Sequence, residues 1–231
     1  MVINCSKDRT SLYLDKDTMT TRSDIIHGSQ ASHRKYGLIY TLKCGWVDLG
    51  HAHPSGALKL WQSIINEPQG SSSHYQISYN QVMGNRHLKI GISKTFNIKR
   101  GLTIADKQSV ALGIFLNVSH DFEQMQGNWI FRHFTNSGYS AEDLVSNLVG
   151  FYRAIDPTTD YIKICEPVQK ELALQLWDTY GAVGEQKNNS ILPYLYPLPP
   201  KPTNKPYRGQ LPIELTTITP AKPGALYHLA D

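Results

Sequence analysis

Hydrophobic residues recur with helical spacing in four stretches of the chain. Apolar positions three or four residues apart fall on one face of a helix, so each stretch predicts an amphipathic or buried helix. The predicted helices span residues 55–66, 106–126, 140–155 and 167–180. Asp156-Pro157 and Gly181 follow the last two of them and are typical stop signals, because proline cannot continue a helix and glycine tolerates left-handed backbone.

Two further stretches alternate between apolar and polar residues, as strands with one buried face do. They flank a Gly84-Asn85 turn, so residues 75–79 and 88–92 predict an antiparallel hairpin. Residues 36–42 predict another strand, which runs into an apolar segment interrupted by Gly45 and Gly50. Helices combined with a small antiparallel sheet predict a soluble α+β domain.

Composition divides the chain into three parts. Residues 1–35 are polar and rich in turn formers, which predicts an irregular N-terminal arm, and residues 36–192 form the predicted α+β core domain. From Pro193 onwards, prolines exclude helix and favour an extended path. Tyrosines are interleaved with these prolines, so we expect the tail, residues 193–231, to pack along the domain.

The helix predicted over residues 106–126 is apolar on nearly every side. One face carries a core stripe of Val110, Ile114, Val118, Phe122 and Met125. The opposite side carries further leucines, so we expect the middle of this helix to be buried.

Near the end of this helix, His120 and Glu123 project from the second side, whereas Asp121 points towards the core stripe and needs a partner there. A histidine and a carboxylate held in a dry site can perform general acid–base catalysis, and they are also plausible ligands of a divalent metal such as zinc. The alternative is a structural hydrogen-bonded pair at the end of a buried helix.

A second polar cluster contains Asp48, His51 and His53. Gly50 permits a turn that could bring Asp48 and His51 together. His51 and His53 share a face of an extended chain, a spacing that can present two imidazoles to one metal. A zinc site would combine histidines from separate segments, and its candidate ligands are His51 and His120. The alternative for His53 is an exposed turn residue beside Pro54.

A third polar cluster opens the helix predicted over residues 140–155. Ser140 with Asp143 is typical of a helix N-cap, which leaves Glu142 as a candidate for a further catalytic carboxylate. Ser146 and Asn147 are poor helix formers inside this helix, and they could face Glu142.

Cys165 offers a different nucleophile. It precedes the helix predicted over residues 167–180, whose dipole would lower the thiol pKa, and His51 would be its base, in the chain order of circularly permuted papain-like hydrolases. The alternative is an inert buried cysteine. Three cysteines without a CxxC motif indicate neither a disulfide framework nor a zinc knuckle, so reduced thiols are expected.

Charge and hydropathy exclude some partners. The net charge of +4 is scattered without a basic block, so no nucleic-acid interface is indicated. No stretch approaches the roughly 18 apolar residues of a membrane span. The first eight residues lack the apolar run of a secretory signal peptide, so we expect synthesis in the cytoplasm, with any export through a specialised secretion system.

Three segments of the chain resemble an uncharacterised bacterial domain family with the pattern Gly-Phe-Ile-Asp-x-x-His, a His-Glu helix, and Ser-x-Phe-Ser-x-Glu-Asp-x-x-Ser-Asn-x-x-Gly. The matching segments are residues 45–51, residues 120–121 and residues 137–150. The resemblance covers residues 36–155 and implies no established reaction. It implies that one site could hold Asp48, His51, His120, Asp121, Glu142 and Asp143.

This chain departs from the family at Asp121, where the family has Glu, and at Cys44, where it has Gly. Position 124 is Gln, so the helix also lacks the second histidine of a zinc-peptidase motif. A shorter carboxylate and a missing histidine both weaken a zinc-peptidase interpretation of this helix.

Three hypotheses follow. The first is a hydrolase whose site combines His51, His120, Glu123 and a further carboxylate, with water activated by a His–carboxylate pair or by a divalent metal. In a secreted antibacterial effector, its substrate would be cell-wall peptide or glycan, and an immunity or delivery protein would be a partner. The second is a cysteine amidase or peptidase using Cys165 and His51. The third is a non-enzymatic module whose tail binds a protein.

Overall fold

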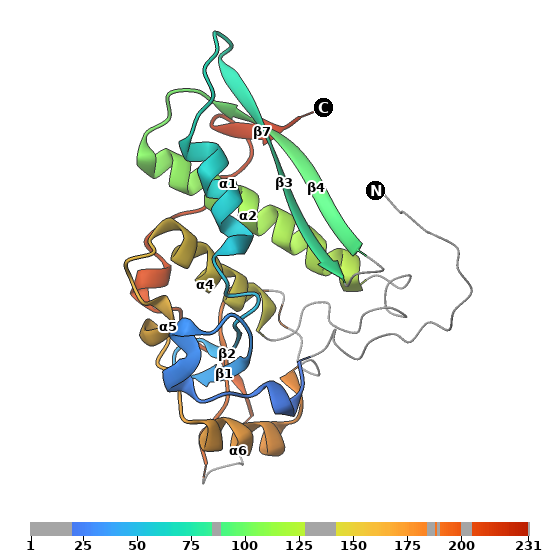
Figure 1. The fold of residues 1–231 in the computed structure, drawn as a ribbon, viewed down its shortest axis with the longest axis vertical. Coiled ribbons are helices and arrows are strands. Elements are labelled where there is room, and N and C mark those ends of the chain that lie inside the picture. Colours follow the sequence, from blue (N-terminus) through green and yellow to red (C-terminus); the bar gives the residue numbers. More distant parts are fainter. Residues whose placement is uncertain are drawn as a thin grey trace, which may run out of the picture.

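Helices and small antiparallel sheets form an α+β fold, which confirms the predicted fold class (Figure 1). The computed structural model describes residues 20–84, 89–127, 142–183, 188, 190–199 and 205–230. Within these ranges, the side chains of residues 83, 84, 89, 90, 123 and 125–127 are not described. The 3₁₀ helices η1, η2 and η4 span Arg22–Asp24, Gly28–His33 and Ile213–Leu215.

Four longer helices lie where the periodicity predicts them. Helix α1 spans Ser55–Ile65, α2 spans Ile104–Gly127, α4 spans Asp143–Ile155 and α6 spans Lys170–Tyr180, and a short α5 spans Tyr161–Ile164. The prediction that Pro167 opens the last long helix is wrong, because Pro167 instead forms an antiparallel bridge with Thr41. In the described part of the chain, each helix is too short or too polar to cross a bilayer.

The largest sheet is built on the predicted hairpin. Strand β3, His74–Gly84, pairs antiparallel with β4, Lys89–Lys99, and β4 pairs antiparallel with β7, Tyr227–Leu229. Tyr75, Ile77 and Tyr79 are buried, as the alternation predicts. The turn that follows Gly84, together with Leu88, lies outside the described residues.

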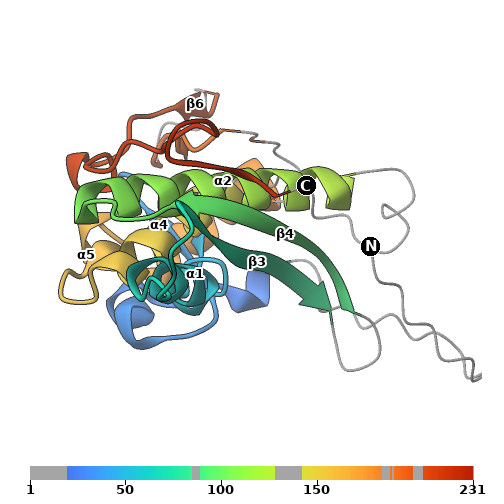
Figure 2. The same cartoon turned by 90° about the horizontal axis from the view of Figure 1, so that it is seen from above.

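Two smaller sheets complete the strands. Strand β1, Leu38–Thr41, pairs antiparallel with β2, Gly45–Asp48, and β5, Tyr194–Leu195, pairs with β6, Tyr207–Arg208. Helix α2 packs against β3 and β4, and seen from above it lies along one side of the hairpin (Figure 2). Helix α1 also packs on β3, while α4 packs against α1, α2 and β2 and thereby joins the larger sheet to the β1–β2 hairpin.

Two hydrophobic clusters hold these elements together. The larger one includes the predicted stripe of α2, where Val110, Ile114 and Val118 are fully buried. The rings of Phe115 on α2 and Phe151 on α4 lie 5.5 Å apart, which fixes the contact between the two helices. The smaller cluster lies around the β1–β2 hairpin and contains Ile25, Leu38, Tyr40, Trp46, Ala173, Leu176, Val183 and Tyr196. Residues from before and after the core domain therefore take part in its packing.

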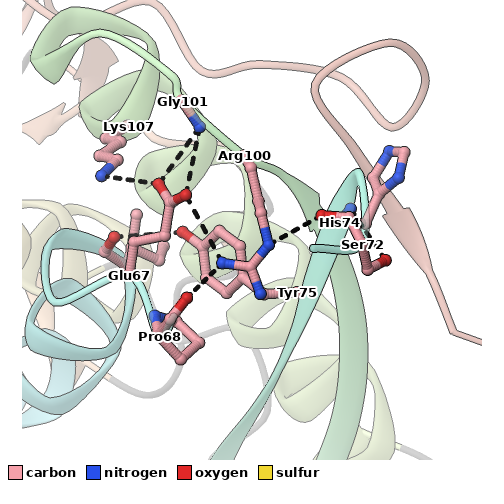
Figure 3. A network of polar contacts seen from close by, with 9 residues as sticks. Glu67, Pro68, Ser72, His74, Tyr75, Arg100, Gly101 and Lys107 are labelled. Atoms are coloured by element: carbon pink, nitrogen blue, oxygen red, sulfur yellow. Dashed lines mark hydrogen bonds and ion pairs between the residues drawn. The ribbon is translucent and has the colours of Figure 1, made fainter. Parts of the chain in front are cut away.

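An ion-pair network ties the end of α1 to the segment between β4 and α2 (Figure 3). The Glu67 carboxylate lies 3.1 Å from Lys107 Nζ and 3.6 Å from Arg100 Nη1, and it accepts a hydrogen bond of 3.2 Å from the Gly101 amide. Arg100 also donates to the carbonyl oxygens of Pro68 and Ser72. These contacts join Glu67 to the segment after β4 and to the first turn of α2, which gives Glu67 a structural role.

Candidate active site

The end of β2 and the first half of α4 meet at a polar turn. The Asp48 amide donates a hydrogen bond of 3.0 Å to Ser146 Oγ. In turn, Asp48 Oδ1 accepts hydrogen bonds from the amides of Gly50, at 2.7 Å, and His51, at 3.1 Å. The carboxylate of Asp48 therefore folds the chain back on itself and holds the His51 backbone beside it. Ser146, a poor helix former, is explained by this contact.

Helix α4 clamps the rest of this turn. A β-carbon at Gly150 would lie 2.7 Å from the His51 carbonyl oxygen, so only glycine permits the close approach. One turn further along α4, the Arg153 guanidinium donates to the Ala52 carbonyl oxygen at 2.8 Å. Ser146, Gly150 and Arg153 therefore fix the position of the segment that carries His51.

Two carboxylates lie buried where α4 begins. Glu142 is 3% exposed and Asp143 is 5% exposed. Glu142 is one helical turn before Ser146, and the Ser146 amide donates to the Glu142 carbonyl oxygen at 2.8 Å. Residues four apart share a helix face, so Glu142 lies on the side of α4 that carries the contact with Asp48. The predicted N-cap residue, Ser140, lies outside the described residues, and Glu142 occupies the N-cap position.

Tyr196 of the tail lies near Glu142 and is held in place by Tyr40 of β1. Burial raises the pKa of Tyr196, and the negative charge of Glu142 raises it further. The Tyr40 hydroxyl accepts a hydrogen bond of 2.8 Å from the Tyr196 amide and donates one of 3.1 Å to the Tyr196 carbonyl oxygen. Burial raises the pKa of Tyr40 to about 12, so this hydroxyl stays protonated. Sequence reasoning missed Tyr196, because a tyrosine in a proline-rich tail gives no sign of this contact.

An exposed aromatic side chain lies at the edge of the turn. Tyr36 is 68% exposed. Its ring lies 3.5 Å from the point where a β-carbon at Gly50 would stand, and Lys35 Nζ lies 5.1 Å from the ring centroid. The turn that holds Asp48 and His51 is thus bordered by a flat aromatic surface open to solvent.

His120 lies in a wetter place than the sequence predicts. Its side chain is 51% exposed, and His120 Nδ1 lies 3.8 Å from Asp121 Oδ1. The prediction of a dry site is wrong for His120, because about half of its side chain is exposed. Asp121 has the partner that its position requires, an ion pair with Lys94 of β4. The side chain of Glu123 lies outside the described residues.

The end of α2 still points to the same side of the molecule as the start of α4. The two helices run in opposite directions, so the C-terminal end of α2 and the N-terminal end of α4 both face the right of the view (Figure 1). The part of α2 that carries His120 therefore lies on the side of the molecule where α4 begins.

A three-ligand metal site is not found in the described part of the chain, where no group of three or more His, Cys, Asp or Glu side chains is arranged to hold an ion. His53, which the sequence offers as a neighbouring ligand, hydrogen-bonds Ser55 Oγ through Nδ1 at 2.7 Å, at the start of α1. Burial lowers the pKa of His53, and the charges of Lys35 and Arg153 lower it further. The role of His53 is therefore structural, as a hydrogen-bond partner of the first residue of α1.

Cys165 does not have the environment that the cysteine hypothesis requires. It lies at the C-terminal end of α5, where a helix dipole disfavours a thiolate, and α6 begins only at Lys170. The thiol is fully buried. The neighbouring Cys44 thiol and the burial together raise the pKa of Cys165 well above the usual value of a thiol. A nucleophilic cysteine needs the opposite shift.

A comparison with protein families places this arrangement in context. The profile of the family described as "Protein of unknown function (DUF4056)" matches residues 10–162, more than half of the chain. The chain belongs to this family. The match confirms the predicted membership of an uncharacterised domain family, while the individual motifs remain a prediction. The matched residues include Asp48, His51, His120 and Glu142. Cys165 and Tyr196 lie beyond the match to DUF4056. No curated protein and no solved structure matches the chain significantly.

Proposed function

We propose that this DUF4056 protein is a hydrolase whose acid–base groups are Glu142 and His51, with Asp48 as the residue that positions His51. One observation carries the proposal: α4 holds a buried carboxylate, 3% exposed, one helical turn from the serine that fixes the Asp48–His51 turn. The centre of the site thus moves from the His120 helix to the junction of β2 and α4.

The types and surroundings of these groups support hydrolysis. A general base removes a proton from water as the oxygen attacks the substrate, and a general acid protonates the leaving group. A carboxyl group and an imidazole are the side chains that most often do this work. Fixed positions reduce the entropy cost of the reaction, and the backbone around His51 is fixed from both β2 and α4. His120 has no acid–base role in this proposal.

We further propose a cell-wall polymer as the substrate class and export by a specialised secretion system as the route to it. Tyr36, exposed beside the turn, offers a flat surface against which a sugar ring or an apolar peptide group can lie. The chain has few charged residues, 18%, and no basic block, so it lacks the charge pattern of a nucleic-acid-binding protein. An immunity protein that covers this face is the partner that such an effector requires.

Digestion of purified peptidoglycan by the full-length protein tests the proposal. Soluble fragments are quantified by liquid chromatography and mass spectrometry, and new reducing ends or new amines identify the bond that is cut. We expect the release rate to fall by about 100-fold or more in Glu142→Gln and His51→Ala. Glu171→Gln is the matched control, because this glutamate is exposed in the first turn of α6.

Circular dichroism of each variant separates lost chemistry from lost folding. A folded Glu142→Gln variant that cuts as fast as the wild type would overturn the assignment of Glu142. No release of fragments by the folded wild-type protein would overturn the choice of substrate.

A further inference from the structure

Two cysteines from distant parts of the chain are brought together by backbone pairing. The turn between β1 and β2 lies along the segment that follows α5. The Leu42 amide donates to the Glu166 carbonyl oxygen at 2.9 Å, and the Lys43 amide donates to the Cys165 carbonyl oxygen at 3.1 Å. These bonds extend the bridge between Thr41 and Pro167, and they hold Cys44 beside Cys165.

The two side chains meet inside the protein. Cys44 is 1% exposed and Cys165 is 0% exposed, and the Cys44 thiol lies near enough to raise the pKa of Cys165. Cys165 Sγ also donates to the Tyr161 carbonyl oxygen at 3.1 Å. A disulfide requires two cysteines that a fixed backbone holds close together, and the hydrogen bonds of Leu42 and Lys43 hold the two segments side by side at this point.

We propose that Cys44 and Cys165 form a structural disulfide when the chain folds in an oxidising compartment. The reaction consumes one disulfide oxidant, such as oxidised glutathione. One thiolate attacks the oxidant and releases a thiol, then the second thiolate displaces the remaining thiol and closes the Cys44–Cys165 bond. The protein loses two hydrogens, and the oxidant gains them. Both thiols are buried in the folded chain, so the bond forms during folding.

The consequence of this bond concerns both stability and place of action. The bond would join the β1–β2 hairpin, which ends at Asp48, to the residue that follows α5. Helix α5 comes directly after α4, and α4 carries the other half of the candidate site. A cross-link across so long a stretch of sequence strongly restricts the unfolded chain. Disulfides persist outside the cytosol, so a pair arranged in this way fits a protein that works after export. The proposal does not rest on the hydrolase assignment.

Refolding of the full-length protein tests the disulfide. The unfolded chain is refolded with excess oxidised glutathione or with excess reduced glutathione, and tryptic peptides are analysed without reduction. We expect the oxidised sample to contain a cross-linked peptide that joins Cys44 to Cys165. We also expect its melting temperature to exceed that of the reduced sample by about 5–15 °C.

Two variants serve as controls. Cys5→Ser should keep the cross-link and the shift in melting temperature, because Cys5 is not a member of the pair. Cys44→Ser should lose both. Free thiols at Cys44 and Cys165 in the oxidised wild type, or cross-links that run mainly through Cys5, would overturn the proposal, as would equal melting temperatures of the oxidised and reduced proteins.

Discussion

At the scale of single residues, the candidate site depends on side chains that bind backbone groups. The Asp48 carboxylate accepts hydrogen bonds from two backbone amides, and the Ser146 hydroxyl accepts one from a third. The Tyr40 hydroxyl hydrogen-bonds both the amide and the carbonyl oxygen of Tyr196. Buried backbone groups need such partners, since each unsatisfied group costs about 1–3 kcal/mol. This leaves His51 and Glu142 as the residues that the proposal assigns to chemistry and leaves Tyr36 for contact with the substrate.

Replacing Tyr36 with alanine should weaken substrate binding and leave the chemical step intact. The ring is exposed beside the turn, and a tyrosine ring that only stacks against substrate takes no part in proton transfer. We expect KM for a soluble cell-wall fragment to rise by about 10-fold with kcat unchanged, the pattern of lost uniform binding. Tyr207→Ala, another exposed tyrosine, at 54%, should change neither constant. A fall in kcat with constant KM would contradict the role of Tyr36.

Glu67 should make stability depend on pH. Burial opposes ionisation of this carboxyl, but Lys107, the Gly101 amide and Arg100 outweigh burial and lower its pKa below the ordinary value of 4.5. A lowered pKa stabilises the fold above the pKa of the unfolded chain, and that stabilisation is lost as the pH falls through the folded pKa. Urea unfolding should therefore show Glu67→Gln to be less stable by about 1 kcal/mol at pH 7. The difference should disappear as the pH falls below 4.5. A difference that stays constant down to pH 3 would show that ionisation is not its origin.

At the scale of elements, α4 positions the turn by close contact as well as by hydrogen bonds. Gly150 lies where any β-carbon would strike the backbone of His51 and Ala52. Gly150→Ala should lower the free energy of unfolding by about 1–3 kcal/mol and reduce activity, because the turn must move.

Gly56→Ala in α1 is the matched control. A β-carbon there meets nothing within 4 Å, and alanine favours a helix by about 1 kcal/mol over glycine. We expect this variant to be as active as the wild type and slightly more stable in urea unfolding. If Gly150→Ala behaves like Gly56→Ala, the proposed contact between α4 and the turn does not exist.

Local patterns in the sequence predict much of this level of structure. The spacing of Val110, Ile114 and Val118 predicts α2, and the alternation of Tyr75, Ile77 and Tyr79 predicts β3, because each pattern reflects one buried face. Pairings between distant segments leave no such pattern. The bridge of Thr41 with Pro167 delays the start of α6, and the tail strand β7 has no local signal.

In the candidate site, too, local features could be predicted from the sequence and contacts between distant segments could not. Gly50 allowed the meeting of Asp48 with the His51 backbone to be anticipated, since a glycine marks a turn. The exposure of His120 was not predictable from helix periodicity, because periodicity identifies the core face and says little about what covers the opposite side. The contact of Ser146 with Asp48 joins segments that are distant in sequence, and it emerges only from the fold.

At the scale of the whole molecule, the C-terminal strand closes a sheet that begins in the middle of the chain. Tyr227 of β7 is 1% exposed, and its ring lies 6.0 Å from that of Phe96 on β4. Tyr227→Ala should lower the free energy of unfolding by about 3–5 kcal/mol, measured in urea. Leu229→Ala on the same strand should change it by less than about 0.5 kcal/mol, because Leu229 is 52% exposed. Equal effects of the two variants would show that the strand is not part of the core.

The most direct test of the proposed function compares Glu142 with His120 in one assay. Peptidoglycan digestion rates of Glu142→Gln and His120→Ala are measured with folded proteins under identical conditions. The proposal predicts a loss of about 100-fold or more for Glu142→Gln and less than about 5-fold for His120→Ala, because only the former removes an acid–base group of the site. A large loss in His120→Ala together with full activity in Glu142→Gln would contradict a site at the junction of β2 and α4.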